Sequence, residues 1–427
     1  MPTVQIDSAR LNRELQELAA FTSVEPSPEG TAVTRIVFTS DDLAARAWLK
    51  GLATEAGFSL RVDSVGNTFI RWQGTDPSLP AVATGSHIDA LPYAGMYDGT
   101  VGVLGGLETM RALKASGFAP TRSIELVLLT SEEPTRFGIG CLGSRLIAGV
   151  LNAERADALP DLSPNAEEGA TLATVRAEAG FTGSLAEVRL APGHYNAWVE
   201  LHIEQGPLLE RDNQPIGVVT SIAAPAGYIF TIHGFGGHAG ALLMPFRRDA
   251  LCAAAEIILS VERHTLAANQ ASGTSDSVAT IGTCQVYPGA VNSVPSRVTL
   301  QLDIRDTDPD RRERTMQSVR QDIADLIATR GVTVDERLVN ADAPTTSSPA
   351  IIAAIDQACA AHNLPIRHMV SRAYHDSSFM AHIAPVAMIF IPCRNGVSHR
   401  PDEYASPADI VRGTHVLASV LAKLASE

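Results

Sequence analysis

The stretch between residues 41 and 150 alternates between short apolar segments and longer segments with a helical apolar stripe. The short segments AVATGS and SIELVLLT predict buried strands, and the longer segments DDLAARAWLKGLATEAGF and GTVGVLGGLETMRALKASGF predict helices. Strands that alternate with helices are typical of a largely parallel sheet, because parallel neighbours need a crossover connection. We therefore expect an α/β fold, in which binding sites lie beyond the carboxyl ends of the strands.

A different pattern begins at about residue 218. Two long helical segments, one of them from Pro309 to Arg330, alternate there with strand-like segments such as SVATIGTCQVY and RVTLQLDIRD. This order predicts two helices on one face of an antiparallel sheet. Because 427 residues exceed the roughly 250 to 300 at which single cores stop growing, two domains are expected. We expect a first domain of residues 1–217 and 337–427, and a second domain of residues 218–336 inserted into it.

Charge and cysteine usage argue against several classes of partner. A formal net charge of -14 argues against general affinity for nucleic acid or an anionic membrane, although local arginines can still bind a small anion. The N-terminal segment has no long apolar run and no visible secretion signal; it predicts an amphipathic helix with Leu11, Leu15 and Leu18 on one side. The five cysteines are scattered and lack CxxC spacing, which fits buried thiols in a reducing cytoplasm. We expect a cytoplasmic protein.

Acidic and imidazole side chains gather in separate short segments, several of them at the ends of expected strands. The segments are GSHID with His87 and Asp89, YDG with Asp98, TSEEPTRFG with Glu132 and Glu133, and LHIEQG with His202, and a further candidate is His399. Any one of these residues has an ordinary explanation, such as a histidine hydrogen-bonded in place. Together they are hard to explain as core, because unpaired carboxylates and imidazoles are costly to bury. The set predicts a metallohydrolase with a pair of divalent metal ions.

Two of these acids have further expected roles. Asp98 can bridge two metals because one carboxylate has two oxygens, and Asp89 is placed to orient the His87 ring as a hydrogen-bond acceptor. In an extended backbone the neighbours Glu132 and Glu133 point in opposite directions, so one can bind metal while the other faces the substrate. A carboxylate beside a metal-activated water can act as general acid and base. The alternative is a pair of surface acids in a turn.

The same segments resemble a known family over nearly the whole chain. GSHID, YDG, SEEPTRFG, LHIEQG and GGHAG are similar to the dinuclear amidohydrolase branch of the M20 metallopeptidase superfamily. SEEPTRFGIGCLGSRLIAG, SRAYHDSSFMA and IFIPCRNGVSHRPDEYASP most resemble the members of that branch that act on ureidoglycolate. The resemblance implies a parallel-sheet catalytic domain that binds two metal ions, with an inserted α+β lid and dimerisation domain.

The resemblance also implies a role for each ligand candidate. One metal would be held by His87, Asp98 and His202, and the other by Asp98, Glu133 and His399, which leaves Glu132 as the catalytic acid and base. Manganese is the ion that the resemblance implies. The chemistry of carboxylate and imidazole ligands without thiolate suits Mn²⁺, Zn²⁺ or Co²⁺, so it does not choose among them.

A homodimer formed through the inserted domain is a further implication. In that arrangement His238, within the GGHAG segment, reaches the partner subunit's site, where it contacts the substrate and stabilises the oxyanion. The alternative is a histidine that is hydrogen-bonded within its own domain.

Candidates for binding the substrate's carboxylate lie in the inserted domain. Arg305 alternates with the apolar Leu302 and Ile304, so it faces away from their side and is free to bind a carboxylate. Its alternative is a surface salt bridge with Asp303 or Asp306.

Four more residues complete the expected substrate site. Asn292, in a turn, can donate to the same carboxylate as Arg305, or can be there for backbone reasons. Gln205 follows His202 closely and is a candidate contact for the ureido group. Tyr374 and His375 precede an expected helix start, which explains them as well as a substrate contact does, and the resemblance makes them specificity residues.

We expect metal-dependent hydrolysis of the ureido amide of (S)-ureidoglycolate to glyoxylate, ammonia and carbon dioxide, a step of ureide and purine catabolism. Hydrolysis of an N-carbamoyl-L-amino acid or of allantoate by the same metals is the nearest alternative. A non-catalytic ligand-binding homologue is an alternative of another class, but binding alone would not need Glu132. A thiol hydrolase based on Cys141 is a further alternative, and it would resist chelators.

Overall fold

The computed structural model describes residues 4–25 and 27–427, which divide into two compact units. Unit 1 holds the described residues up to Thr220, together with Thr346–Met369 and His375–Glu427. Unit 2 holds Ser221–Thr345 and Val370–Tyr374. It extends past residue 336 because strand β14 (Thr333–Ala341) pairs with β9 (Ala224–His233) as far as Ala341.

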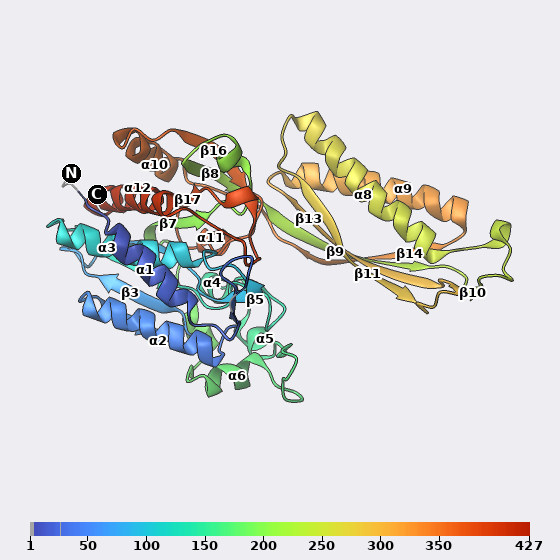
Figure 1. The fold of residues 1–427 in the computed structure, drawn as a ribbon, viewed down its shortest axis with the longest axis horizontal. Coiled ribbons are helices and arrows are strands. Elements are labelled where there is room, and N and C mark those ends of the chain that lie inside the picture. Colours follow the sequence, from blue (N-terminus) through green and yellow to red (C-terminus); the bar gives the residue numbers. More distant parts are fainter. Residues whose placement is uncertain (1–3, 26) are drawn as a thin grey trace. The chain divides into compact units, whose positions relative to one another are not determined.

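The main sheet of the described chain has nine strands (Figure 1). Its order is β15-β8-β17-β7-β4-β6-β3-β2, with β16 paired to β8. Neighbours are parallel from β17 through β7 and β4 to β6, whereas β8, β3 and β2 pair antiparallel. The α/β expectation is therefore confirmed at the centre of the sheet. The strands are β2 (Ser59–Val62), β3 (Thr68–Trp72), β4 (Ala81–Ser86), β6 (Ile124–Leu128), β7 (Tyr195–Ile203), β8 (Ile216–Ile222), β15 (Thr345–Thr346), β16 (Ile366–Ser371) and β17 (Val386–Ile391), and β1 (Val33–Arg35) pairs separately with β5 (Ala90–Ala94).

Helices cover both faces of this sheet because its central strands are apolar on both sides. Val82 and Leu126 pack into one core, and their chain neighbours Ala83 and Val127 pack into the other. The first core is covered by α1 (Ser8–Ala19), α2 (Ser40–Glu55), α3 (Thr100–Ala115), α10 (Pro349–Ala361) and α12 (Pro407–Ser426). The second is covered by α4 (Leu142–Ala148), α5 (Ala153–Asp157), α6 (Leu172–Glu178) and α11 (Ser377–Met380), and α7 (Leu208–Arg211) follows β7. The apolar stripe expected on the N-terminal helix is buried in α1.

Unit 2 is a four-stranded antiparallel sheet with two helices on one face (Figure 1). The sheet order is β11 (Val278–Tyr287), β13 (Arg297–Asp306), β9 and β14, and the helices are α8 (Ala250–Ser272) and α9 (Pro309–Arg330). Asp249 and Asp308 cap the helix starts, because each carboxylate accepts two backbone N–H groups of the first turn. A short ribbon of β10 (Gly237–His238) and β12 (Ser293–Val294) completes the unit.

Within residues 4–25 and 27–427, no helix combines the length and the apolar character needed to cross a bilayer.

Candidate metal centre

The first three ligand candidates meet at the carboxyl ends of two central strands of the main sheet. His87 directly follows β4, His202 is the penultimate residue of the parallel strand β7, and Asp98 lies two residues before α3. The intervening Gly99 has a φ of 67°, and a side chain there would bring its Cβ to 2.4 Å from His87 Nε2. Only glycine therefore lets the turn carrying Asp98 pass so close to the imidazole.

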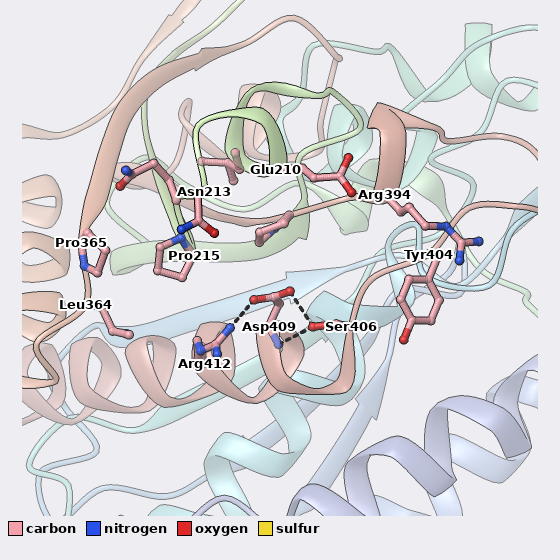
Figure 2. Close-up of a pocket in the computed structure, with 13 residues that line it drawn as sticks. Glu210, Asn213, Pro215, Leu364, Pro365, Arg394, Tyr404, Ser406, Asp409 and Arg412 are labelled. Atoms are coloured by element: carbon pink, nitrogen blue, oxygen red, sulfur yellow. Dashed lines mark hydrogen bonds and ion pairs between the residues drawn. The ribbon is translucent and has the colours of Figure 1, made fainter.

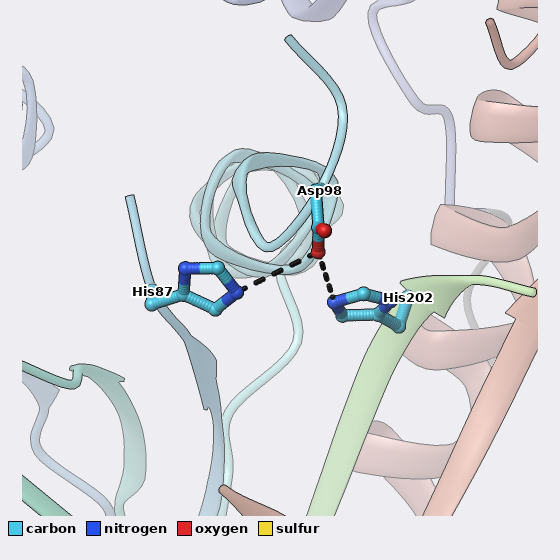
Figure 3. Close-up of side chains that lie close together, drawn as sticks. All are labelled: His87, Asp98 and His202. Atoms are coloured by element: carbon cyan, nitrogen blue, oxygen red, sulfur yellow. Dashed lines mark ion pairs between the residues drawn. The ribbon is translucent and has the colours of Figure 1, made fainter. Parts of the chain in front are cut away.

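His87, Asp98 and His202 form a buried cluster (Figure 3). Asp98 Oδ1 lies 3.6 Å from His87 Nε2 and 3.1 Å from His202 Nε2. The Nδ1 of each ring is hydrogen-bonded to a backbone carbonyl. His87 Nδ1 lies 3.0 Å from Asp89 O, and His202 Nδ1 lies 2.9 Å from Ile203 O. A carbonyl can only accept, so each Nδ1 carries a hydrogen, and each Nε2 faces the Asp98 carboxylate. A protonated ring donates from Nε2 to Asp98, and a neutral ring offers the Nε2 lone pair to a metal ion that takes the place of that hydrogen.

Asp98 also belongs to a second cluster, with Glu133 and His399. Its other oxygen, Oδ2, lies 3.0 Å from His399 Nε2, and that nitrogen is 3.6 Å from Glu133 Oε1. Each oxygen of one carboxylate therefore faces a different ligand group. This is the geometry of a carboxylate that bridges two ions.

The electrostatics of the two clusters favour positive charge. Burial opposes ionisation of Asp98, but hydrogen bonds from His202, His399 and His87 hold its pKa well below the usual value. Burial raises the pKa of Glu133 well above the usual value, and the charge of Asp98 adds to that effect. Divalent cations would offset this concentration of buried acids. The donors are oxygen and nitrogen only, so the residues fit Mn²⁺, Zn²⁺ or Co²⁺.

Glu132 and Glu133 follow the end of β6 and do not lie in an extended strand, so the alternation of an extended backbone does not set their directions. Strand β6 ends at Leu128, and Ser131 has a left-handed φ of 57°. The two side chains nevertheless diverge, because Glu133 faces His399 while Glu132 Oε2 lies 3.9 Å from His87 Nε2. Burial raises the pKa of Glu132 well above the usual value, which suits a group that must exchange protons.

The Asp89 carboxylate mainly holds the backbone of these two glutamates. It accepts the N–H of Glu132 at 3.3 Å and that of Glu133 at 3.1 Å. Its Oδ1 is 3.7 Å from His87 Nδ1, whereas its backbone oxygen is 3.0 Å from that atom. The shorter contact that fixes the His87 ring is therefore made by the main chain of Asp89.

Cys141 lies beside Glu132 and is fully buried. Its thiol donates to Glu132 Oε1 at a distance of 3.3 Å. Burial raises the pKa of this thiol well above its usual value, and the neighbouring Glu132 raises it further. A thiol that stays protonated is a poor nucleophile, so the geometry argues against the thiol-hydrolase alternative.

Gln205 and His375 contact the clusters directly. Gln205 Nε2 donates to Asp98 Oδ2 at 2.8 Å and to Ser398 Oγ at 3.2 Å. Its Oε1 is buried and has no hydrogen-bond partner among the residues that the structure describes. His375 is buried and packs edge-on against the His202 ring, with 4.6 Å between the ring centroids. Both residues therefore contact a ligand candidate, Asp98 or His202, and lie close enough to contact a molecule bound at the metal centre.

The remaining predicted site residues belong to unit 2. The β10–β12 ribbon pairs His238 with Ser293, next to Asn292, whose carbonyl accepts the Ala239 N–H at 2.9 Å. His238 is exposed, and its Nδ1 accepts the Gly240 N–H at 3.1 Å. This contact places the ring hydrogen on Nε2, so the exposed nitrogen of His238 is a hydrogen-bond donor.

Arg305 lies on the open face of the unit 2 sheet, as its alternation with buried Ile304 predicts. Its guanidinium donates to both oxygens of Asp303, each at 2.9 Å, which is one of the surface pairings considered from the sequence. The hydroxyl of Tyr374 donates to Asp342 at 3.0 Å. Neither contact prevents an exchange for a substrate group, since partly exposed ion pairs and hydrogen bonds are weak.

Sequence reasoning missed several buried acids near the metal centre, among them Glu403, Asp376 and Glu200, the last of which groups with His202 and His375. Glu403 accepts hydrogen bonds from the backbone of both Asp98 and His399. Asp376 accepts from Ser144 Oγ at 2.5 Å, and burial raises its pKa to about 7. Glu403 and Asp376 follow candidate residues closely in sequence, at spacings of four and one. Nothing in their local sequence distinguishes them from surface acids, so only the tertiary structure reveals them.

A cavity of about 550 Å³ lies elsewhere in unit 1 (Figure 2). Apolar side chains such as Leu364 and Pro365 line it, together with charged ones such as Arg394 and Arg412. None of its lining residues is a ligand candidate. Arg412 and Ser406 are both engaged with Asp409 there, so these polar groups already have partners.

Comparison with known proteins agrees with the geometry. A model of peptidase family M20/M25/M40 matches residues 83–423. The chain belongs to this family. It is accordingly a hydrolytic enzyme of a metal-dependent family, and the clustered ligands described above fit that chemistry.

Two relatives and one solved structure show the degree of similarity within the family. The chain is 48% identical to "Ureidoglycolate hydrolase" of Oryza sativa subsp. japonica, over 98% of this chain and 85% of the relative. It is 34% identical to "N-carbamoyl-L-amino-acid amidohydrolase" of Pseudomonas sp. (strain NS671), over 99% of this chain and 100% of the relative. The crystal structure of AtUAH in complex with glyoxylate matches with a TM-score of 0.85 and 46% identity, covering 99% of both chains.

Proposed function

We propose that this chain hydrolyses the ureido amide of (S)-ureidoglycolate, a step of ureide and purine catabolism. The bridging position of Asp98 between two ligand groups, with Glu132 beside them, supports metal-dependent hydrolysis. The substrate is supported by the 48% identity to a ureidoglycolate hydrolase, against 34% to an N-carbamoyl-L-amino-acid amidohydrolase. Allantoate or N-carbamoyl-L-amino acids are the alternative substrates.

The centre takes two divalent ions, which we propose to be manganese. His87, Asp98 and His202 would hold one ion, and Asp98, Glu133 and His399 the other. Bound there, the ions would polarise the ureido carbonyl and lower the pKa of a water molecule.

The acid and base in this proposal is Glu132. It accepts a proton from the attacking water and passes it to the leaving nitrogen, for which its raised pKa is suited. Attack of one water breaks the bond between the ureido carbon and the nitrogen that bears the hydroxyl-bearing carbon, which gives hydroxyglycine and carbamate, and carbamate decomposes to carbon dioxide and ammonia. The hydroxyglycine that remains is a hemiaminal, and it collapses to glyoxylate and a second ammonia.

Recognition of a substrate this small depends on polar contacts. Arg305 and Asn292 are proposed to bind its carboxylate, and Gln205 its ureido group. Tyr374 and His375 are proposed to select for the hydroxyl-bearing carbon. The donor Nε2 of His238 is proposed to stabilise the oxyanion of the tetrahedral intermediate.

A homodimer formed through unit 2 is also part of the proposal. Strand β11 is at the edge of the unit 2 sheet, so one of its sides has backbone groups open to pairing. Leu259 and Leu266 of α8 are 57% and 62% exposed and lie seven residues apart on the helix, so they offer apolar surface that a partner could cover. A second copy of the chain would cover both features and would bring His238 to the partner subunit's site.

We also propose a cytoplasmic location. None of the five cysteines forms a disulfide, and three of them are buried, which fits a reducing compartment.

Complementation tests the proposed role of His238 across the dimer. His238→Ala and Glu132→Gln dimers should each be inactive, because each lacks one part of every site. After subunit exchange, activity should recover to about a quarter of wild type, since about half the dimers are mixed and each has one intact site of two. Absence of recovery, with exchange verified by mass, would place His238 within its own subunit or outside catalysis.

An ammonia-release assay tests the substrate. The manganese-loaded protein should release two ammonia molecules per (S)-ureidoglycolate and should prefer it to allantoate and to several N-carbamoyl-L-amino acids in kcat/KM. Preference for an N-carbamoyl-L-amino acid would shift the assignment to that activity. No turnover of any of them, with metal bound, would favour a ligand-binding homologue.

A further inference from the structure

We propose that Glu403 is a positioning residue that builds the metal centre by holding two loops together, the turn that carries Asp98 and the loop that carries His399. These loops are about 300 residues apart in sequence, yet Asp98 and His399 must lie side by side to share an ion. This role of Glu403 rests on the metal centre proposed above, and it explains how the two ligand-bearing loops of that centre are held side by side.

The two oxygens of the Glu403 carboxylate divide their contacts between the loops. Oε1 accepts the backbone N–H of Tyr97 at 2.8 Å and that of Asp98 at 3.1 Å. Oε2 accepts the Ser398 hydroxyl at 2.7 Å and the His399 N–H at 3.3 Å. The side chain is only 3% exposed, so water cannot replace these bonds. One carboxylate therefore ties the backbone of the bridging ligand to the backbone of a second ligand.

The loop that carries His399 needs such a hold, because its backbone is strained. His399 itself has a left-handed φ of 61°, and Asn395 has a φ of 56°. A non-glycine residue is strained in this region and persists only where the surroundings impose it. Arg394 N–H donates to Tyr404 O at the base of the loop, the Asn395 N–H donates to Glu210, and Glu403 accepts from Ser398 and His399 near its tip.

The turn that carries Asp98 is shaped around the same carboxylate. A Cβ on Gly95 would lie 2.6 Å from Glu403 Oε1, and one on Gly99 would lie 2.4 Å from His87 Nε2. The turn thus passes between Glu403 on one side and a ligand ring on the other. Any shift of Glu403 would move Asp98 relative to His87.

The chemistry of the contacts requires a carboxylate. Three of the four donors are backbone N–H groups, which can only donate. Glutamine has the same shape but a single acceptor oxygen, so its amide NH₂ would face donors of one loop or the other. Glu403→Gln can therefore hold one loop at a time but not both.

The test compares Mn²⁺ binding by the full-length Glu403→Gln protein with that of wild type and of Glu108→Gln, after chelation and reloading. Glu108 is a matched control: it is buried and ties Asp7 N–H and Arg10 to α3, but it touches no proposed ligand. We expect Mn²⁺ affinity to fall by about 10-fold to 100-fold in Glu403→Gln, as for other residues that orient metal ligands. Glu108→Gln should lower the apo-protein Tm and leave Mn²⁺ affinity unchanged.

A second variant covers the case in which Glu403→Gln does not fold. Gly95→Ala keeps the carboxylate but places a methyl group 2.4 Å from Glu403 Cβ and 2.6 Å from its Oε1, so Glu403 and the turn that carries Asp98 must move apart, and the variant should also weaken Mn²⁺ binding. Gly51→Ala, where the added methyl meets nothing within 4 Å, is its control. Wild-type affinity in the Gly95→Ala and Glu403→Gln proteins would overturn the role of Glu403. Absence of Mn²⁺ binding by wild type would instead overturn the metal centre itself, and this inference with it.

Discussion

Replacing Glu132 with glutamine should lower turnover by about 10²-fold to 10⁴-fold or more while leaving the metal content near that of wild type. The change keeps the shape of the side chain and removes the proton acceptor. Glu132 is not a member of either proposed ligand group, so its loss should not release an ion. The measurement is kcat for ureidoglycolate, paired with metal stoichiometry by elemental analysis of the same sample.

Glu133→Gln is the matched comparison, because it makes the same change one residue away. Glu133 faces His399 and Asp98, so its variant should lose part of the occupancy of one ion. The adjacent carboxylates would be wrongly assigned if Glu132→Gln lost metal and Glu133→Gln kept it.

Removing the metal should abolish activity completely, and Mn²⁺ should restore it best. Without cations, the buried acids Asp98 and Glu133 and the partly buried Glu132 lie close together, and the charges that offset them are imidazoles. Reloading should therefore also raise the Tm, because an ion that binds only the folded state stabilises it. Activity and thermal unfolding would be followed through chelation, dialysis and titration with Mn²⁺, Zn²⁺ and Co²⁺.

A chelator saturated beforehand with Mn²⁺ is the control, and it should leave the enzyme unchanged. Full activity in a preparation verified to be free of metal would end the metallohydrolase proposal.

Much of the fold could be predicted because apolar periodicity is a local property. The segments AVATGS and SIELVLLT became β4 and β6, and the helix expected from Pro309 to Arg330 is α9. The pattern was less informative at the margins of the main sheet. Strands β2 and β3 pair antiparallel there, and nothing in their short segments indicates the direction of pairing.

The ligand candidates were accessible from sequence because each is a chemically distinctive residue near a strand end or a glycine. His87, Asp98 and His202 indeed meet in the structure. The backbone conformation at Glu132 could not be predicted, because β6 ends at Leu128 and the Asp89 carboxylate then accepts the Glu132 N–H. That hydrogen bond joins residues 43 positions apart, so no local sequence pattern could predict it.

Residue types and short-range periodicity were enough to predict the class of fold, the ligand candidates and the type of chemistry, because both can be read along the chain. The orientation of the candidate donors depends on contacts that form when the chain folds. The fold turns the Nε2 atoms of His87 and His202 toward Asp98, packs Glu132 against Cys141, and brings Glu403 into contact with the loops of Asp98 and His399. These contacts join residues far apart in the chain, and their strength depends on burial, which exists only once the chain has folded.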